Sequence, residues 1–140
     1  MPKLRHIAYR AADVEGMAQF FAQSFDMAIA QRRTNGAIDL SDGVINVTIL
    51  PLVSARQDGQ PQHQGIDHIG FTVEDENESR KKLIAAGGTE LNTINLGGVA
   101  NYEVKFLGPE NIIVDFGHWI GAAPIDEQSA VSGQLAAVSN

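Results

Sequence analysis

The clearest pattern along the chain is an eight-residue segment that occurs twice and alternates between apolar and small or polar side chains. The first copy, HIAYRAAD, runs from His6 to Asp13, and the second, HIGFTVED, runs from His68 to Asp75. Alternation with a period of two predicts a strand, and an Asp at its end predicts the N-cap of a following helix. Repetition at a fixed spacing indicates two copies of one structural unit.

A helical pattern follows each Asp, over residues 14–25 and 76–86. In the first of these, Val14, Met17, Phe21 and Phe25 form one apolar stripe. Further strands are predicted over 37–40 and 44–50 in the first half, and over 102–107 and 112–117 in the second. Each half is therefore strand, helix, then strands. We expect a first module over 1–53, a linker over 54–64, a second module over 65–119 and a loose tail over 120–140.

Composition and charge narrow the function classes. The chain has 140 residues, of which 44% are hydrophobic and 19% charged, as in an ordinary globular protein. A net charge of −7 with scattered Lys and Arg makes nucleic acid an unexpected partner. No signal peptide or membrane-spanning run is visible, so a cytoplasmic location and no membrane partner are expected. With no cysteine, metal ligands must come from His, Asp, Glu or amide oxygens.

Side chains alternate across a strand, so the residues that share a face can be read from the pattern. One face of the five predicted strands is apolar and should pack beneath the helices. The other face is mixed, and it carries His6, Ala8, Arg10, Asn46, Thr48, His68, Gly70, Thr72, Glu103, Lys105, Ile113, Asp115 and Gly117.

The simplest interpretation of this mixed face is a solvated side of an antiparallel sheet. Two histidines at equivalent positions of a repeat, with Asp115 in an otherwise apolar strand, favour a metal site instead, because a lone Asp there is costly without a partner. Two imidazoles and one carboxylate suit a divalent transition metal, namely Zn, Ni, Co, Mn or Fe, and leave coordination positions open for a substrate.

The repeated segments, together with the stretch GPENIIVDF from Gly108 to Phe116, resemble the vicinal oxygen chelate superfamily over about residues 3–119. That superfamily includes lactoylglutathione lyases, methylmalonyl-CoA epimerases, extradiol dioxygenases and the fosfomycin and bleomycin resistance proteins. The resemblance implies an α+β fold of two tandem βαβββ modules, whose mixed sheet curls as a cup around a metal with the helices outside. It also implies a homodimer.

By resemblance, His6 and His68 correspond to the metal ligands on the first strand of each module. Asp115 takes the place of the glutamate ligand of the last strand, with a carboxylate shorter by one methylene. The fourth family position falls on Asn46, which could ligate the metal or hold a bound water.

The resemblance implies a small-molecule substrate that chelates the metal through two neighbouring oxygens, and favours a lyase or an epimerase that works through an enolate-type intermediate. Glu103 is the predicted proton acceptor, although a solvated glutamate paired with Lys105 or Arg10 is nearly as reasonable. Arg10, Thr48, Thr72 and Lys105 are candidate substrate contacts. An Fe(II) ring-cleaving dioxygenase and a metal-free drug-binding protein are the alternatives. Residues 95–101 form either a loop that closes over the ligand or a plain hairpin connection.

Overall fold

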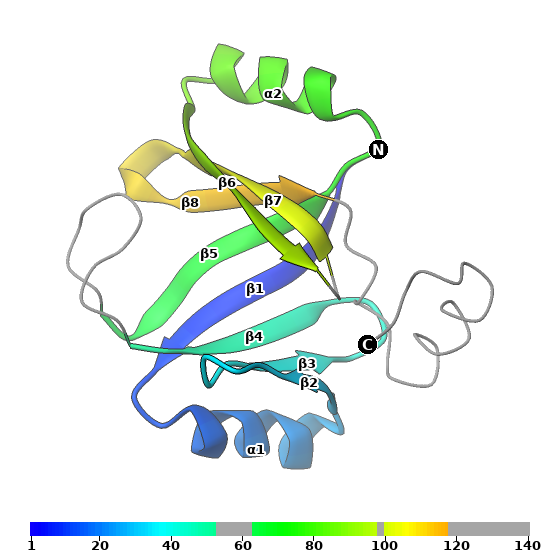
Figure 1. Ribbon diagram of the computed structural model, residues 1–140, viewed down its shortest axis with the longest axis vertical. Coiled ribbons are helices and arrows are strands. Elements are labelled where there is room, and N and C mark those ends of the chain that lie inside the picture. Colours follow the sequence, from blue (N-terminus) through cyan, green and yellow to red (C-terminus); the bar gives the residue numbers. More distant parts are fainter. Residues whose placement is uncertain (53–62, 98–99, 118–140) are drawn as a thin grey trace.

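Eight strands form one open mixed sheet, with a helix at each of its two ends (Figure 1). The computed structural model describes residues 1–52, 63–97 and 100–117. The strand order across the sheet is β2-β3-β4-β1-β5-β8-β7-β6. The elements are β1 Lys3–Ala11, α1 Val14–Phe25, β2 Ala28–Arg32, β3 Ile38–Ser41, β4 Asn46–Pro51, β5 Gly65–Thr72, α2 Glu76–Ala85, β6 Thr89–Gly97, β7 Ala100–Leu107, the short 3-10 turn η1 Pro109–Asn111, and β8 Ile113–Gly117.

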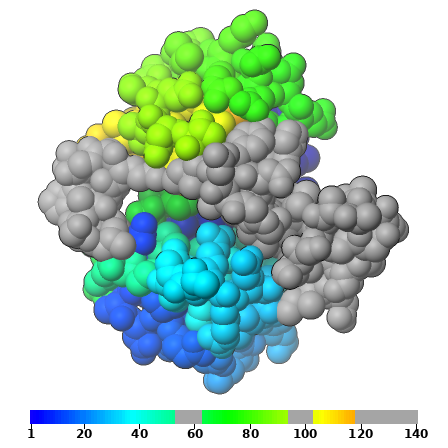
Figure 2. Space-filling model, in the orientation of Figure 1, coloured from blue at the N-terminus to red at the C-terminus, as the bar shows by residue number. Residues whose placement is uncertain are grey.

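The sheet consists of two modules with the same pairing pattern. In each module the first strand runs parallel to the last, as β1 does to β4 and β5 to β8, and the other neighbours are antiparallel. The antiparallel pair β1 and β5 joins the modules, and we call this junction the seam. The two modules occupy opposite ends of the molecule, the first in blue to cyan and the second in green to yellow (Figure 2). The prediction of two βαβββ modules is confirmed.

Two strands were absent from the sequence prediction. β2 is an edge strand of half-buried residues with no clean alternation, so its pattern is weak. β6 pairs with β7 as a hairpin, and it extends to Gly97 while β7 begins at Ala100. The hairpin alternative for residues 95–101 is thus the one observed, with 98–99 outside the described residues. Most of the predicted linker and all of the predicted tail also lie outside them.

The helices begin where the sequence predicted, because each cap carries a suitable carboxylate. Asp13 accepts a hydrogen bond from the amide of Gly16, and Asp75 accepts one from the amide of Glu78. Side chains of α1 pack on the outer face of β1, β3 and β4, with Ala18 completely buried. None of the helices in the described part of the chain has the length and apolar character needed to cross a membrane.

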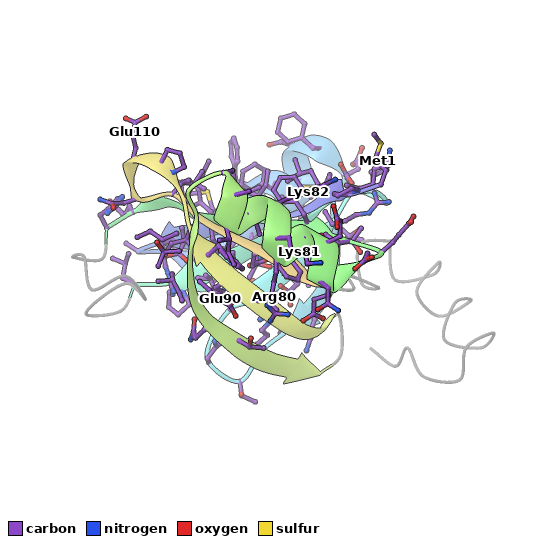
Figure 3. The ribbon with its side chains drawn as sticks, turned by 90° about the horizontal axis from the view of Figure 1, so that it is seen from above. Met1, Arg80, Lys81, Lys82, Glu90 and Glu110 are labelled. Atoms are coloured by element: carbon purple, nitrogen blue, oxygen red, sulfur yellow. The ribbon has the colours of Figure 1, made fainter. Side chains whose placement is uncertain are left out.

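Helix α2 packs less deeply than α1, since none of its described residues is buried. Polar contacts of Arg80 help to hold it in place: this side chain bonds Glu76 one turn away and reaches Glu90 of β6 at 3.3 Å (Figure 3). The Arg80 guanidinium also lies 5.8 Å from the ring centroid of Phe116. Beneath this helix, Val104, Phe106 and Phe116 form the core of the second module. Both cores lie on the apolar face, so the mixed face is left for the site.

Candidate metal centre

The two repeated histidines meet at the seam. His6 is paired with Gly70 and His68 with Ala8, so the imidazoles project from neighbouring strands on the same face. Their Nε2 atoms lie 2.9 Å apart and both side chains are almost completely buried. The two copies of the sequence repeat therefore place their histidines side by side, in a local two-fold arrangement.

Two carboxylates complete a cluster with these histidines. Asp115 Oδ2 lies 3.3 Å from His68 Nε2, and Glu103 Oε2 lies 4.0 Å from the same nitrogen. His6, His68, Glu103 and Asp115 each offer one ligand atom, and these atoms all lie within 4.8 Å of one another. The structure thus brings the predicted ligands His6, His68 and Asp115 together with the predicted base Glu103.

Gly70 allows this close approach. A Cβ atom at this position would lie 2.5 Å from Asp115 Oδ1 and 2.7 Å from His6 Cδ2. Gly70 is paired with His6 on one side and Asp115 on the other, so the missing side chain leaves the space in which the two groups converge. The backbone of Gly70 does not have a positive φ, and the requirement for glycine is therefore one of space.

The ring of His68 is oriented by its chain neighbour. Its Nδ1 lies 2.7 Å from Asp67 Oδ2, and Asp67 in turn accepts a hydrogen bond of 3.3 Å from Arg10 Nε. Consecutive strand residues normally point to opposite faces, but the pairing of β1 with β5 shifts register between Ala8 and Tyr9 and passes over Asp67. A bulge of this kind redirects a side chain. An ionised carboxylate only accepts, so the Nδ1 of His68 carries the proton.

A second chain of contacts orients His6. The hydroxyl of Thr48 donates to Asp39 Oδ1 at 2.6 Å, and Asp39 also accepts two bonds from Arg33. Thr48 Oγ1 lies 3.4 Å from His6 Nδ1. The single hydroxyl proton is used toward Asp39, so Thr48 is an acceptor toward His6 and the Nδ1 of His6 carries the proton as well.

With both protons on Nδ1, each Nε2 presents a lone pair toward the other. Burial, followed by the neighbouring His68, lowers the pKa of His6 well below its usual value. Burial, followed by Lys105, lowers the pKa of His68. In these tautomers neither nitrogen has a proton to share across the 2.9 Å between them, and both lone pairs are available to a cation. Neutral imidazole with its second nitrogen tied to a carboxylate or hydroxyl is the form that binds metals.

The carboxylates share a buried ammonium group. Lys105 Nζ lies 2.7 Å from Glu103 Oε2 and 2.9 Å from Asp115 Oδ2, and Lys105 is only 2% exposed. Although burial raises the pKa of Glu103, Lys105 together with His6, His68 and a hydrogen bond with Asp115 outweighs burial and lowers that pKa to about 2. Burial, and then repulsion by Glu103, raises the pKa of Asp115 well above its usual value. Asp115 Oδ1 has no hydrogen-bond partner among the described residues.

The donor set fits a divalent transition metal. It combines two imidazoles in the tautomer that exposes Nε2, a carboxylate oxygen without a partner, and a glycine that keeps the space between them clear. Asn46 lies beside His6 across β1 and β4, and its amide oxygen and nitrogen are also buried without a described partner. An amide oxygen beside the cluster could accept a bond from a metal-bound water.

Strand register identifies the first-module counterpart of Asp115 as Thr48. His68 is paired with Ile113, two residues before Asp115, whereas His6 is paired with Asn46, two residues before Thr48. Thr48 in turn faces Asp39 just as Asp115 faces Lys105. Asn46, which the sequence analysis assigned to the fourth family position, lies two residues before this threonine, and Thr48 contacts His6 without offering a carboxylate.

The remaining predicted residues lie further from the imidazoles. Arg10 is engaged by Asp67 and by the carbonyl of Pro51 at 2.7 Å, so its charge is already partnered. Thr72, at the end of β5, is paired with Lys3 and Gly117. Sequence reasoning missed Asp67, Asp39 and Arg33. The alternation of β3 places Asp39 on the mixed face and could have found it, whereas the bulge concealed Asp67.

Comparison with known proteins agrees with this geometry. The family model of the Glyoxalase/Bleomycin resistance protein/Dioxygenase superfamily matches residues 3–116. The chain belongs to this superfamily. A search of curated proteins found no match.

Solved structures of low sequence identity share the fold. The 2,3-dioxygenase LapB from Pseudomonas sp. KL28 is similar with a TM-score of 0.64 and 19% identity; the match covers 84% of this chain and only 40% of that chain. Methylmalonyl-CoA epimerase from Mycobacterium tuberculosis is similar with a TM-score of 0.56 and 12% identity over 91% of each chain. A methylmalonyl-CoA epimerase in complex with methylmalonyl-CoA and NH4+ has a TM-score of 0.58 and 12% identity, with 89% of this chain and 99% of that chain covered. The fold therefore occurs in proteins of different reaction classes.

Proposed function

We propose that this protein is a metal-dependent lyase, epimerase or isomerase, whose small substrate presents two adjacent oxygens to a divalent transition metal held by His6, His68 and Asp115. Assembly as a homodimer and a cytoplasmic location stay predictions. The observation that carries the proposal is the buried imidazole pair, whose Nε2 atoms face each other at 2.9 Å with both Nδ1 atoms engaged elsewhere. With both Nδ1 atoms engaged elsewhere, the two Nε2 atoms are placed to bind one cation together.

The chemistry of the proposed site divides between the metal and the protein. A bound metal would act as a Lewis acid on the substrate oxygens. Glu103 would accept the proton that the substrate loses next to a carbonyl, since its carboxylate lies beside the imidazoles, 4.0 Å from His68 Nε2, and is positioned by Lys105. Glu103 is buried, so little bulk water competes with the substrate for its carboxylate. Lys105 lies where it can partner negative charge that develops on a substrate oxygen.

An Fe(II) ring-cleaving dioxygenase is the second candidate. Two histidines and one carboxylate with open positions are the ligand set of non-haem Fe(II) oxygenases. The similarity to LapB supports the fold but not the reaction, because the identity is low. The two candidates differ in whether oxygen is consumed.

The first experiment measures the metal content of the purified protein. The purified protein should hold about one divalent metal per chain by elemental analysis, and His6→Ala and His68→Ala should each lose it. An Arg80→Ala variant, which alters a polar contact of α2 away from the site, should keep it. Full metal content in both histidine variants would exclude the site.

Reaction class is then decided with the loaded protein. Candidate 2-oxo thioesters, hemithioacetals and catechols are incubated in deuterated solvent while deuterium uptake and oxygen consumption are followed. The lyase or epimerase proposal predicts exchange without oxygen uptake, and Glu103→Gln should lose roughly 10²–10⁴-fold in exchange rate. Catechol-dependent oxygen uptake without exchange would favour the dioxygenase.

A further inference from the structure

Lys105 is the least expected member of the buried cluster. It lies on β7, directly opposite Asp115 of β8, and its ammonium is within hydrogen-bond distance of both carboxylates. Lysine is seldom buried this deeply unless it is paired. A divalent cation beside the histidines would bring a second positive charge into the space that this ammonium faces, so the two cations must divide the carboxylates between them.

The distances indicate which carboxylate lies closer to Lys105 and which lies closer to the histidines. Glu103 is closer to Lys105, at 2.7 Å, and farther from His68 Nε2, at 4.0 Å. Asp115 is only 3.3 Å from His68 Nε2, and its second oxygen, Oδ1, faces the gap at Gly70 beside His6 without a described partner. Asp115 thus contacts both the ammonium, at 2.9 Å, and His68, and keeps Oδ1 beside His6, whereas Glu103 contacts the ammonium and lies farther from His68.

The two modules differ at just this point. The register counterpart of Lys105 in the first module is Asp39, which is neutralised by Arg33 at its outer side. The carboxylate of the first module is therefore already paired with a guanidinium, whereas in the second module Lys105 is bonded to both Glu103 and Asp115. Because the first module has an aspartate at the corresponding position, the positive charge of Lys105 is specific to this site and is not shared by the two modules.

We infer that Lys105 acts as an internal counter-cation that holds Glu103 back from the metal, so that the metal is bound by His6, His68 and Asp115 and keeps positions open for the substrate. The inference rests on the proposed metal site. It makes Lys105 a positioning residue that sets ligand number, and it explains how a carboxylate so near the histidines stays available for proton transfer.

The test uses Co(II) alone as the probe, with affinity measured by competition against a chelating dye and ligand number followed in the visible spectrum. Lys105→Met frees Glu103 to join the metal, so it should bind Co(II) at least about tenfold tighter and change the spectrum, because one more charged ligand is added. Glu103→Gln should bind like the wild type, and Lys105→Met combined with Glu103→Gln should lose the gain. Lys81→Met, an exposed lysine of α2, is the matched control and should change nothing.

Two results would overturn the inference. One is a Lys105→Met variant that binds Co(II) no tighter than the wild type. The other is a Glu103→Gln variant that loses as much affinity as Asp115→Asn, which would make Glu103 a ligand already. If Lys105→Met is too unstable to purify, Lys105→Gln, which also removes the charge, takes its place in the same comparison. Failure of the proposed metal site is a different result, since the wild type and His6→Ala would then bind Co(II) equally poorly.

Discussion

The space left by Gly70 supports a quantitative prediction. In Gly70→Ala, the new Cβ would approach Asp115 Oδ1 to 2.5 Å and His6 Cδ2 to 2.7 Å, whereas ordinary contact begins at 3.4 Å. To restore contact, the two side chains must together give way by about 0.7–0.9 Å at each point, in a region packed without spare volume. Both side chains are proposed metal ligands, so the strain falls on the site itself.

Two effects should follow. Overpacking of this size costs about 1–3 kcal/mol, which for a chain of this length lowers Tm by roughly 3–10 °C. Displaced ligands should weaken metal binding by about 10–100-fold, the range found when groups that orient ligands are lost. Thermal unfolding of the metal-free protein measures the first effect, and Co(II) competition measures the second.

The local two-fold arrangement supplies a matched control. Ala8 is the counterpart of Gly70, since it is paired with His68 as Gly70 is with His6, and it is completely buried. Ala8→Gly removes a Cβ instead of adding one, so it should cost about 0.5–1 kcal/mol of stability and leave Co(II) affinity nearly unchanged. A Gly70→Ala variant with wild-type Tm and wild-type affinity would refute the packing argument.

Two further predictions concern protons and ring orientation. Metal binding should become tighter as pH rises, because the raised pKa of Asp115 means that a protonated carboxyl group must lose its proton to bind the metal, whereas the lowered pKa values of both histidines favour their neutral form. Calorimetry in buffers of different ionisation enthalpy measures proton release on binding, and proton uptake would contradict the assignment. Asp67→Asn should weaken Co(II) binding by about 10–100-fold, because it weakens the hydrogen bond that orients His68. The control Asp13→Asn, which changes only the cap of α1, should leave Co(II) affinity unchanged. Equal affinities in the two variants would argue against the role of Asp67.

Much of the fold was predictable because it follows from short-range patterns in the sequence. The repeat fixed the positions of β1 and β5, and the aspartate at the end of each copy marked a helix start. Alternation correctly placed His6, His68, Glu103 and Asp115 on one face, where their ligand atoms lie within 4.8 Å of one another. The edge strand β2 lacked such a pattern.

What could not be predicted depends on how strands align. Thr48 became the counterpart of Asp115 only through the register of β1 with β4, which alternation leaves open. Asp67 shares a direction with His68 because of a bulge, and a bulge breaks the rule by which faces are assigned. The division of the carboxylates by Lys105 is a matter of distances between strands. Local patterns contain no such distances.

The seam gives a bound cation a second role as a crosslink. His6 and His68 are 62 residues apart in the chain, and each belongs to a different module. A cation held by both would close a long loop, much as a disulfide does, in a protein that has no cysteine to make one. Loss of the cation would therefore remove a crosslink between the two modules as well as a reactive centre.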